Sequence, residues 1–344
     1  MPLKIRLADL GADREVIIDC LRRFLSPEAD AARDDWLSLG SPHGPAMAWI
    51  SVDEGSGETI GVASAFPRRA VLDGAEVLGW VLGDFCIHPE YRTLGPALQL
   101  NRACLDAVDR GGVAFCYDFP SQSMMAVYRR LRISPIGSVV RYSRVLRWGR
   151  RLGRAIPVPG LREGVAAIAS IADLLPPRRA RVPADLSMRL HADAFGAEFD
   201  GLNRERRETS RLHLDRSAAH LNWRYRSNPG PRYDLLAARD ARGLRGYAVF
   251  TQRGSEAELS DVAALDDEAA RALVDEAAAV LWRRGAVTLS MSLFPSHSIA
   301  PVLRHGGYRP REESPVIFHG GPALQRRPAL AGVDIPLTHG DRES

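Results

Sequence analysis

The segment LGDFCIHPEYRTLGPALQLNRACLDAV, residues 82–108, decides how the rest of the chain is interpreted. It is an apolar strand that runs into a turn, RTLGPA at residues 92–97, and the turn opens an amphipathic helix. The first amides of a helix have no intrahelical partner and lie at the positive end of its dipole, so they bind anions. Gly95 leaves room for a phosphate, Pro96 is tolerated in a first turn, and Arg92 supplies a cation. The segment therefore predicts a phosphate-binding turn.

A short motif occurs once in each half of the chain, as FPSQS at residues 119–123 and as FPSHS at residues 294–298. Each copy follows an apolar run typical of a strand and precedes a short helical stretch. The apolar runs are residues 113–117 and 286–293, and the helical stretches are residues 124–131 and 299–305. Because the same order of strand, helix, strand, motif and helix surrounds both copies, we interpret the chain as two similarly built α/β domains.

Hydrophobic periodicity and turn residues predict the other elements of the two domains. In the first domain, we expect a strand at 4–8, a helix at 14–25, a hairpin of 47–52 with 59–66, and a long strand at 77–87. In the second domain, we expect a strand at 186–192 and a hairpin of 233–238 with 244–251.

These patterns divide the chain into four parts: residues 1–146, 147–183, 184–320 and 321–344. The part at 147–183 is rich in Arg and Pro and encloses a short apolar helix at 165–175. We expect this helix to pack across the two domains, with a peripheral membrane contact as the open alternative. The residues after Phe318 are expected to be disordered or loosely docked.

The composition is that of a globular protein, with 45% hydrophobic and 26% charged residues among 344. The net charge is only +4, and Lys4 is the single lysine, so the arginine richness does not indicate a nucleic-acid partner. No apolar run is long enough for a membrane span, and the first residues lack the apolar core of a secretory signal. The four cysteines have no metal-ligand spacing. We therefore expect a cytoplasmic protein with no metal, no integral membrane segment and no nucleic acid.

The turn at residues 92–97 resembles the signature of the GCN5-related N-acetyltransferase (GNAT) superfamily, (Arg/Gln)-x-x-Gly-x-(Gly/Ala), which Arg92, Gly95 and Ala97 satisfy. The resemblance covers residues 1–145, and residues 184–318 by element order and the FPS motif. It implies a tandem GNAT fold, α/β (α+β), in which each domain is a mixed, mostly antiparallel sheet flanked by helices. It also implies acetyl-CoA as cosubstrate. The implied cofactor-binding residues are Phe85, Cys86, Ile87, Arg92, Thr93, Leu94, Gly95, Pro96, Ala97 and Ser121.

Two catalytic residues are implied by the same resemblance. Residues 121–133 partly match a family helix, with Tyr128 at the position of the tyrosine that protonates the departing thiolate. Arg132 stands where the family has Gly, and Tyr128 as a core residue remains the alternative. Asp84 lies in the strand that supplies a carboxylate base in relatives, and its alternative role is to hold backbone amides where strands splay.

The second domain departs from this pattern. Asp266, Asp267 and Glu268 occupy the place of the phosphate turn, and three carboxylates would repel a pyrophosphate. Leu303 stands at the position of Tyr128. We expect this domain not to bind CoA and to help form the acceptor site. Residues 220–236 combine aromatic side chains with arginines, which indicates either a stacked ligand or an interdomain contact.

The residues and the resemblance together predict an N-acetyltransferase that moves an acetyl group from acetyl-CoA to a primary amine of a small molecule, such as an amino sugar, by direct attack. One alternative uses a longer acyl-CoA or an acyl carrier protein, which the arginines of residues 141–154 could receive. Another is a degenerate scaffold without catalysis. Transfer from aminoacyl-tRNA is disfavoured by the intact phosphate turn.

Overall fold

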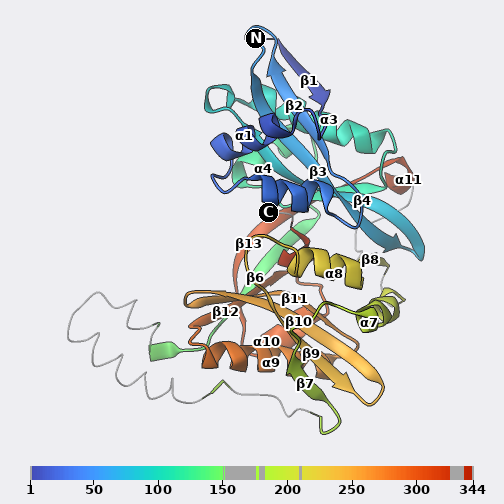
Figure 1. Ribbon diagram of the computed structural model, residues 1–344, viewed down its shortest axis with the longest axis vertical. Helices are drawn as coiled ribbons and strands as arrows, with labels where there is room; N and C mark the ends of the chain where they lie inside the picture. The colour runs from blue at the N-terminus through green and yellow to red at the C-terminus, as the bar shows by residue number, and fades with distance from the viewer. Residues whose placement is uncertain are drawn as a thin grey trace, which may run out of the picture.

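The computed structural model describes residues 2–149, 151, 176–177, 183–208, 211–325 and 337–342. Its two halves are stacked along the long axis, with β1 at one end and β7 at the other (Figure 1). The first half contains β1 (Leu3–Leu7), α1 (Arg14–Phe24), α2 (Ala31–Asp34), the π-helical turn η1 (Asp35–Leu39), β2 (Met47–Asp53), β3 (Thr59–Leu72), β4 (Ala75–Ile87), η2 (Pro89–Tyr91), α3 (Leu94–Asp109), β5 (Phe115–Asp118), α4 (Gln122–Arg130) and β6 (Gly137–Val145).

The second half repeats this order of elements. It contains β7 (Ser187–Leu190), α7 (Ala197–Arg207), β8 (Leu212–Leu214), α8 (Ala218–Tyr225), β9 (Asp234–Asp240), β10 (Gly243–Arg253), β11 (Glu256–Ala264), α9 (Asp267–Arg283), β12 (Thr288–Leu293), α10 (Ile299–His305), β13 (Arg309–Gly320), α11 (Pro322–Gln325) and η3 (His339–Asp341). The fold class predicted from the sequence is confirmed, because the strands form a mixed, mostly antiparallel sheet flanked by helices.

The strands of the two halves are continuous, in the order β1-β2-β3-β4-β5-β13-β6-β12-β11-β10-β9-β7. The halves exchange strands at the centre. β13 comes from the second half and pairs with β5, while β6 comes from the first half and pairs with β12. β13 and β6 also pair with each other, so the exchange closes the boundary between the halves with backbone hydrogen bonds.

Helices cover both faces of each half-sheet. On β2, Ala48 and Ile50 pack with α1, whereas Trp49 packs with α3. On β10, Ala248 packs in the core that contains α9, whereas Tyr247 packs in the core that contains α7 and α8. Successive side chains of a strand point to opposite faces, so each half-sheet lies between two helical layers.

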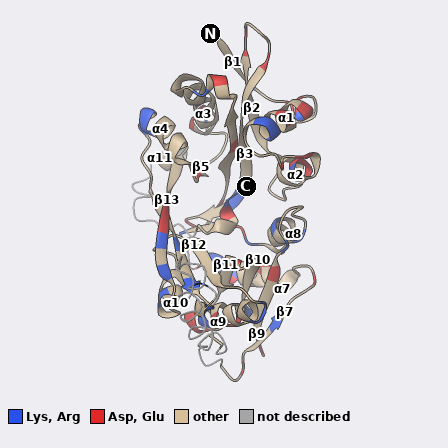
Figure 2. Cartoon of the chain, turned by 90° about the vertical axis from the view of Figure 1, so that its left-hand side faces the viewer, with Lys and Arg blue, Asp and Glu red and all other residues tan. Residues whose placement is uncertain are grey.

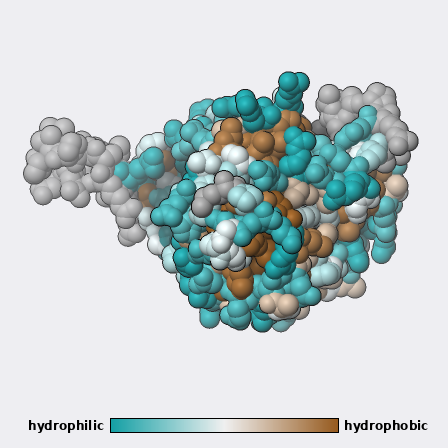
Figure 3. All heavy atoms as spheres, turned by 90° about the horizontal axis from the view of Figure 1, so that it is seen from above, coloured by the Kyte–Doolittle hydropathy of each residue, from teal (hydrophilic) through white to brown (hydrophobic). Residues whose placement is uncertain are grey.

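The outer surface is that of a water-exposed protein. Acidic and basic residues are interspersed on both halves (Figure 2). Seen from the end that carries β1, the surface is mostly hydrophilic, with smaller apolar patches (Figure 3). In the part of the chain that the structure describes, no helix has the length and apolar character needed to cross a membrane. The predicted apolar helix at 165–175 lies outside the described residues.

Residues 337–342, here called the C-terminal strap, correct the expectation of a loose tail after Phe318. Leu337, Thr338 and Asp341 are each at most 1% exposed. The strap lies between β11 and β12, since Thr338 forms a β-bridge with Leu293 and donates its hydroxyl to the carbonyl of Ser260 at 3.3 Å. Its polar residues are buried because the partners that satisfy them come from distant parts of the chain.

Candidate active site

A cavity of about 1550 Å³ opens where β4 and β5 separate. The two strands pair in parallel through Gly79–Phe115, Trp80–Cys116 and Val81–Tyr117 and then diverge. The cavity is lined by the diverging ends of both strands, by α3 and α4, and on the far side by β11 and the C-terminal strap. It exceeds the roughly 300–1,000 Å³ of an ordinary small-molecule pocket, so a large cofactor and a second substrate can share it.

Asp84 lies at an irregularity of β4 beside the cavity. β3 advances from Val62 to Ser64 while β4 spans Cys86 to Gly83, so β4 carries an extra residue there. Asp84 adopts a φ of +47°, and its carboxylate accepts two hydrogen bonds from Arg33 of α2, at 2.8 and 2.7 Å. The structure thus brings Asp84 to the cavity, with both oxygens engaged by one guanidinium.

The predicted cofactor-binding residues gather along one side of this cavity. Phe85, Cys86 and Ile87 line it from β4, Ser121 from the start of α4, and Arg92, Thr93, Leu94 and Ala97 from the turn before α3 and its first residues. Gly95 and Pro96 lie in the same first turn of α3 and are not among the lining residues. Eight of the ten predicted residues thus line one cavity, and their role in binding a cofactor stays a prediction.

The N-terminus of α3 is free to bind an anion. Its N-cap residue Thr93 makes no side-chain capping bond, which leaves first-turn amides without that partner. A Cβ at Gly95 would meet nothing within 4 Å, so the space beside it is open. Arg92 donates to the carbonyls of Ile87 and Phe24, at 3.0 and 3.1 Å, and so ties the turn to β4 and α1.

Tyr128 and Asp118 form a pair at the point where β4 and β5 separate. The Tyr128 hydroxyl donates to Asp118 at 2.7 Å. Tyr128 is fully buried, and burial raises its pKa well above the ordinary value of a tyrosine. Burial also raises the pKa of Asp118 to about 6, against the opposing effect of the hydrogen bond from Tyr128. Asp118 lines the cavity and Tyr128 does not, so the hydrogen bond connects the buried phenol to a residue of the cavity wall.

Asn101 is a second cavity residue that sequence reasoning missed. It lies on α3, is 2% exposed, and lines the cavity. Among the described residues, its side-chain amide nitrogen has no hydrogen-bond partner. An unpaired buried amide costs about 1–3 kcal/mol, so Asn101 favours a ligand that supplies a hydrogen-bonding group at this place.

The far wall of the cavity is polar and comes from the second half and the strap. Its charged residues include Arg253, Glu256, Glu258, His339 and Arg342. Glu258 and His339 form an ion pair at 2.6 Å. The side of the cavity opposite β4 and α3 therefore carries both acidic and basic side chains.

Residues 220–236, the aromatic segment predicted to be either a stacking site or an interdomain contact, form a contact between the two halves. Trp223 stacks on Trp36, with ring centroids 5.1 Å apart. Each indole donates to the main-chain carbonyl of the other tryptophan at 2.8 Å. Tyr225 and Tyr233 of the same segment reach the cavity.

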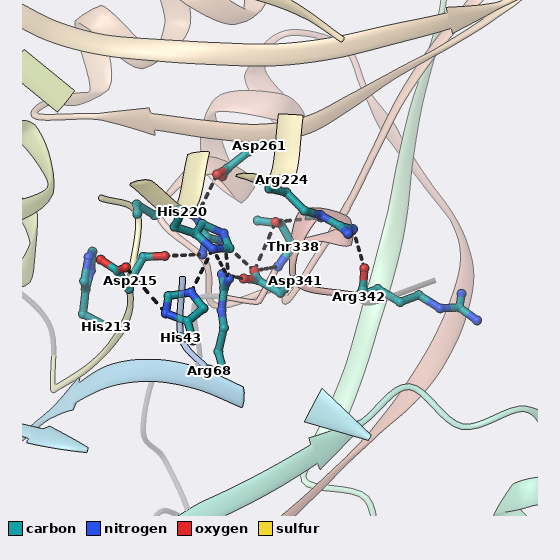
Figure 4. Close-up of polar contacts among 12 residues, drawn as sticks. His43, Arg68, His213, Asp215, His220, Arg224, Asp261, Thr338, Asp341 and Arg342 are labelled. Atoms are coloured by element: carbon teal, nitrogen blue, oxygen red, sulfur yellow. Dashed lines mark hydrogen bonds and ion pairs between the residues drawn. The ribbon is translucent and has the colours of Figure 1, made fainter. Parts of the chain in front are cut away.

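A buried ionic cluster holds the strap beneath this wall (Figure 4). Asp341 accepts from Arg68 of β3 and from Arg216 of the second half, both at 2.7 Å, and is 0% exposed. Arg216 also donates to Asp261 at 2.7 Å. Burial would raise the pKa of Asp341, but the two guanidinium groups outweigh it and hold that pKa far below the usual range. The cluster therefore links both halves through one carboxylate.

Comparison with known proteins was made by sequence and by structure. No protein-family model matches the chain, and no curated protein matches its sequence. Solved structures do match. A GCN5-related N-acetyltransferase from Anabaena variabilis has a TM-score of 0.64 at 14% identity, over 92% of this chain and 72% of that one. A GCN5-related N-acetyltransferase from Kribbella flavida has a TM-score of 0.59 at 17% identity, over 92% of this chain and 71% of that one. The chain has the tandem GNAT fold.

Saccharomyces cerevisiae N-myristoyltransferase with bound myristoyl-CoA is similar as well, with a TM-score of 0.60 at 12% identity, over 93% of this chain and 79% of that one. At such identities the likeness concerns the fold, which agrees with the resemblance inferred from residues 92–97.

The two halves of this GNAT fold differ at the gap between diverging strands. β11 and β12 pair in parallel only from Glu256–Thr288 to Glu258–Ser290, and the strap fills the space beyond. The N-terminus of α9 is capped by Asp266, which accepts from the Ala269 amide at 2.8 Å. The second half therefore has neither the open gap nor the uncapped helix that the first half presents.

Within residues 2–149, 151, 176–177, 183–208, 211–325 and 337–342, no cluster of His, Cys, Asp and Glu has the arrangement needed to hold a metal ion.

Proposed function

We propose that the protein is an acyl-CoA-dependent N-acyltransferase that transfers the acyl group to a primary amine of a small molecule. The observation that carries the proposal is the opening between β4 and β5 beside the uncapped N-terminus of α3, in a chain with the GNAT fold. A diphosphate at this terminus would place the pantetheine arm along Phe85, Cys86 and Ile87, and the thioester near the point where the strands diverge.

Acetyl-CoA is the proposed donor, as the resemblance to the GNAT superfamily first implied. The cavity has room for a longer acyl chain, and the yeast N-myristoyltransferase of the same fold binds myristoyl-CoA. A series of acyl-CoA thioesters of increasing length distinguishes the two donors by their kcat/KM values. Of the arginines of residues 141–154 proposed to receive an acyl carrier protein, Arg141 donates twice to Glu312 and Arg147 lies over Trp282. The carrier-protein donor stays an alternative, and a binding assay with a charged carrier protein distinguishes it.

The acceptor is proposed to enter from the wall formed by β11 and the strap. Glu256 and Glu258 on this wall suit a cationic amine, and Ser260 and Tyr225 suit hydroxyl groups, as an amino sugar carries. The amine nitrogen would attack the thioester carbonyl directly, so that no acyl-enzyme forms. We place this reaction in the cytoplasm.

The roles predicted for Asp84, as proton acceptor, and for Tyr128, as proton donor, stay predictions. Asp84 accepts two hydrogen bonds from Arg33, and its remaining lone pairs would take the proton from the amine. Tyr128 does not line the cavity and must turn away from Asp118 to reach a thiolate there. Asp118 does line the cavity and accepts the Tyr128 hydroxyl, so it is a third candidate for the proton transfer.

The donor site is tested by calorimetric titration with acetyl-CoA and with free CoA. Gly95→Glu places a carboxylate beside the proposed diphosphate, in a position where a Cβ meets no neighbour, so we expect loss of CoA binding without loss of the fold. Gly201→Glu is the matched control. It puts the same side chain on a helical glycine of α7 that also has open space, and no residue of α7 lines the cavity.

One site per chain that is lost only in Gly95→Glu would support the proposal and would open a screen of amine acceptors. Equal affinity of a well-folded Gly95→Glu variant and the unchanged protein would contradict the phosphate site. Two sites per chain would show that the second half also binds CoA.

A further inference from the structure

Asp118 lies where β4 and β5 of the first half diverge. It is the residue after Tyr117, where the last pair of β4 and β5 ends, so it lies at the apex of the diverging strands. Its carboxyl group lines the cavity and accepts the Tyr128 hydroxyl at 2.7 Å. If the diphosphate of the donor lies at α3 and its arm follows β4, the reacting thioester comes to this apex.

The second half offers an internal comparison. The FPSHS motif at residues 294–298 aligns Leu293 with Asp118 and Leu303 with Tyr128. Both leucines are fully buried, and the strap occupies the gap beside them. The carboxyl and the phenol are therefore replaced together in the half whose gap is filled. A pair needed only to hold strand and helix together would be equally useful in both halves.

We infer that Asp118 is a catalytic residue that carries the proton from the attacking amine to the departing CoA sulfur, and that Tyr128 is the positioning residue that orients its carboxylate. This inference rests on the proposed function and names for it a residue that was not among those predicted from the sequence.

The proton balance of the step is complete. The bound ammonium group first releases one proton to solvent. The neutral amine then forms the C–N bond, and its excess proton passes from nitrogen to the Asp118 carboxylate. The C–S bond breaks, and Asp118 returns that proton to the thiolate. The products are an amide and the CoA thiol, and Asp118 ends in the ionised form in which it began. Tyr128 keeps its own proton and holds one carboxylate oxygen through it.

The groups around Asp118 determine its ionisation. Tyr128 faces it from α4, Cys104 lies near it on α3, and Arg342 of the strap favours the charged form. The amide of Phe119, the residue directly after β5, also stabilises the carboxylate. Burial outweighs them and raises the pKa of Asp118 to about 6. At neutral pH the carboxylate is thus mostly ionised and ready to accept a proton, and its acid form is accessible enough to return one.

The test measures CoA release from acetyl-CoA with glucosamine, putrescine and tyramine as probe amines, between pH 5 and 8. For the unchanged protein, turnover at saturating amine is expected to rise with pH through an inflection near 6, because Asp118 must be ionised to accept the proton. Asp118→Asn should reduce turnover about 100-fold or more and abolish the inflection, while its calorimetric affinity for acetyl-CoA stays within about threefold.

Tyr128→Phe keeps the packing and removes the hydrogen bond that favours the carboxylate, so the inflection should move to higher pH with a smaller loss of turnover. The matched control is Asp53→Asn. Asp53 is also buried and also accepts a tyrosine hydroxyl, that of Tyr91, but it lies outside the cavity lining. This variant should leave both turnover and the inflection unchanged.

The outcomes separate the two proposals. Unchanged turnover and pH profile in Asp118→Asn would overturn the role of Asp118 and leave the acyltransferase in place. Failure of the unchanged protein to bind acetyl-CoA, or to release CoA with every probe amine, would overturn the proposed function and this role with it. If Tyr128→Phe lost as much turnover as Asp118→Asn does, and its inflection stayed at the same pH, Tyr128 would be the proton donor instead.

Discussion

Arg132 has a backbone conformation that residues with a side chain rarely adopt. It follows the end of α4 with a φ of +60°, the left-handed conformation that the GNAT pattern fills with glycine. We expect Arg132→Gly to raise the free energy of unfolding by about 0.5–1 kcal/mol. Relief of the left-handed backbone is worth about 1–2 kcal/mol, and the added freedom of glycine in the unfolded chain removes part of it.

Urea unfolding measures this change, with Arg129→Gly as the control. Arg129 lies inside α4 and is exposed, so the same substitution there should lower the free energy of unfolding by about 1 kcal/mol. Destabilisation by both substitutions would show that the side chain of Arg132 contributes more than its backbone costs.

Most of the residues predicted from the sequence to bind the cofactor line the cavity, and Asp118 and Asn101, which also line it, were not among those predicted. Local spacing was enough for the turn at residues 92–97, because all its parts are contiguous. Asp118 stands directly before the FPSQS motif, and its replacement by Leu293 in the second copy was a usable signal. Arg33, by contrast, meets Asp84 across 51 positions of sequence, and no local pattern encodes such a contact.

At the scale of elements, the periodic segments and the two hairpins, β2 with β3 and β9 with β10, were predicted. The pairing of β6 and β13 across the halves was not. The helix expected at 14–25 is α1, and that at 299–305 is α10. The prediction of a loose tail was wrong for residues 337–342, because Thr338 and Asp341 are residue types typical of an exposed loop. Their burial depends on Arg216 and Arg68, which lie 125 and 273 positions from Asp341.

The strap requires glycine at one position. A Cβ at Gly340 would lie 2.4 Å from the Tyr225 hydroxyl and 2.8 Å from the Ser260 carbonyl. We therefore expect Gly340→Ala to displace the strap and lower the free energy of unfolding by about 1–3 kcal/mol in urea. Gly201→Ala, on a helix with open space, should instead be neutral or stabilising by up to about 1 kcal/mol. An unaltered unfolding curve for Gly340→Ala would mean that the strap does not hold the halves together.

At the scale of the whole molecule, the exchange of β6 and β13 makes the halves of the sheet depend on each other. A repeat in the sequence suggests two units that fold separately, because a repeat records element order and not strand pairing. In the structure, β5 pairs with β13 on one side, and β6 pairs only with β13 and β12 of the other half. The stacked tryptophans and the carboxylate of Asp341 join the same halves again.

This dependence predicts the behaviour of the separated halves. Expressed alone, residues 1–149 would keep β6 without either of its partners and would leave β5 unpaired on the side of β13. Unpaired strand edges and an exposed core favour aggregation. We therefore expect neither residues 1–149 nor residues 183–344 to unfold cooperatively alone, and we expect the co-expressed pieces to form a 1:1 complex that does. Circular dichroism during heating and light scattering report both results. A stable, cooperatively unfolding monomer of residues 1–149 would show that the first half can close its sheet without β13, with β6 folding back beside β5.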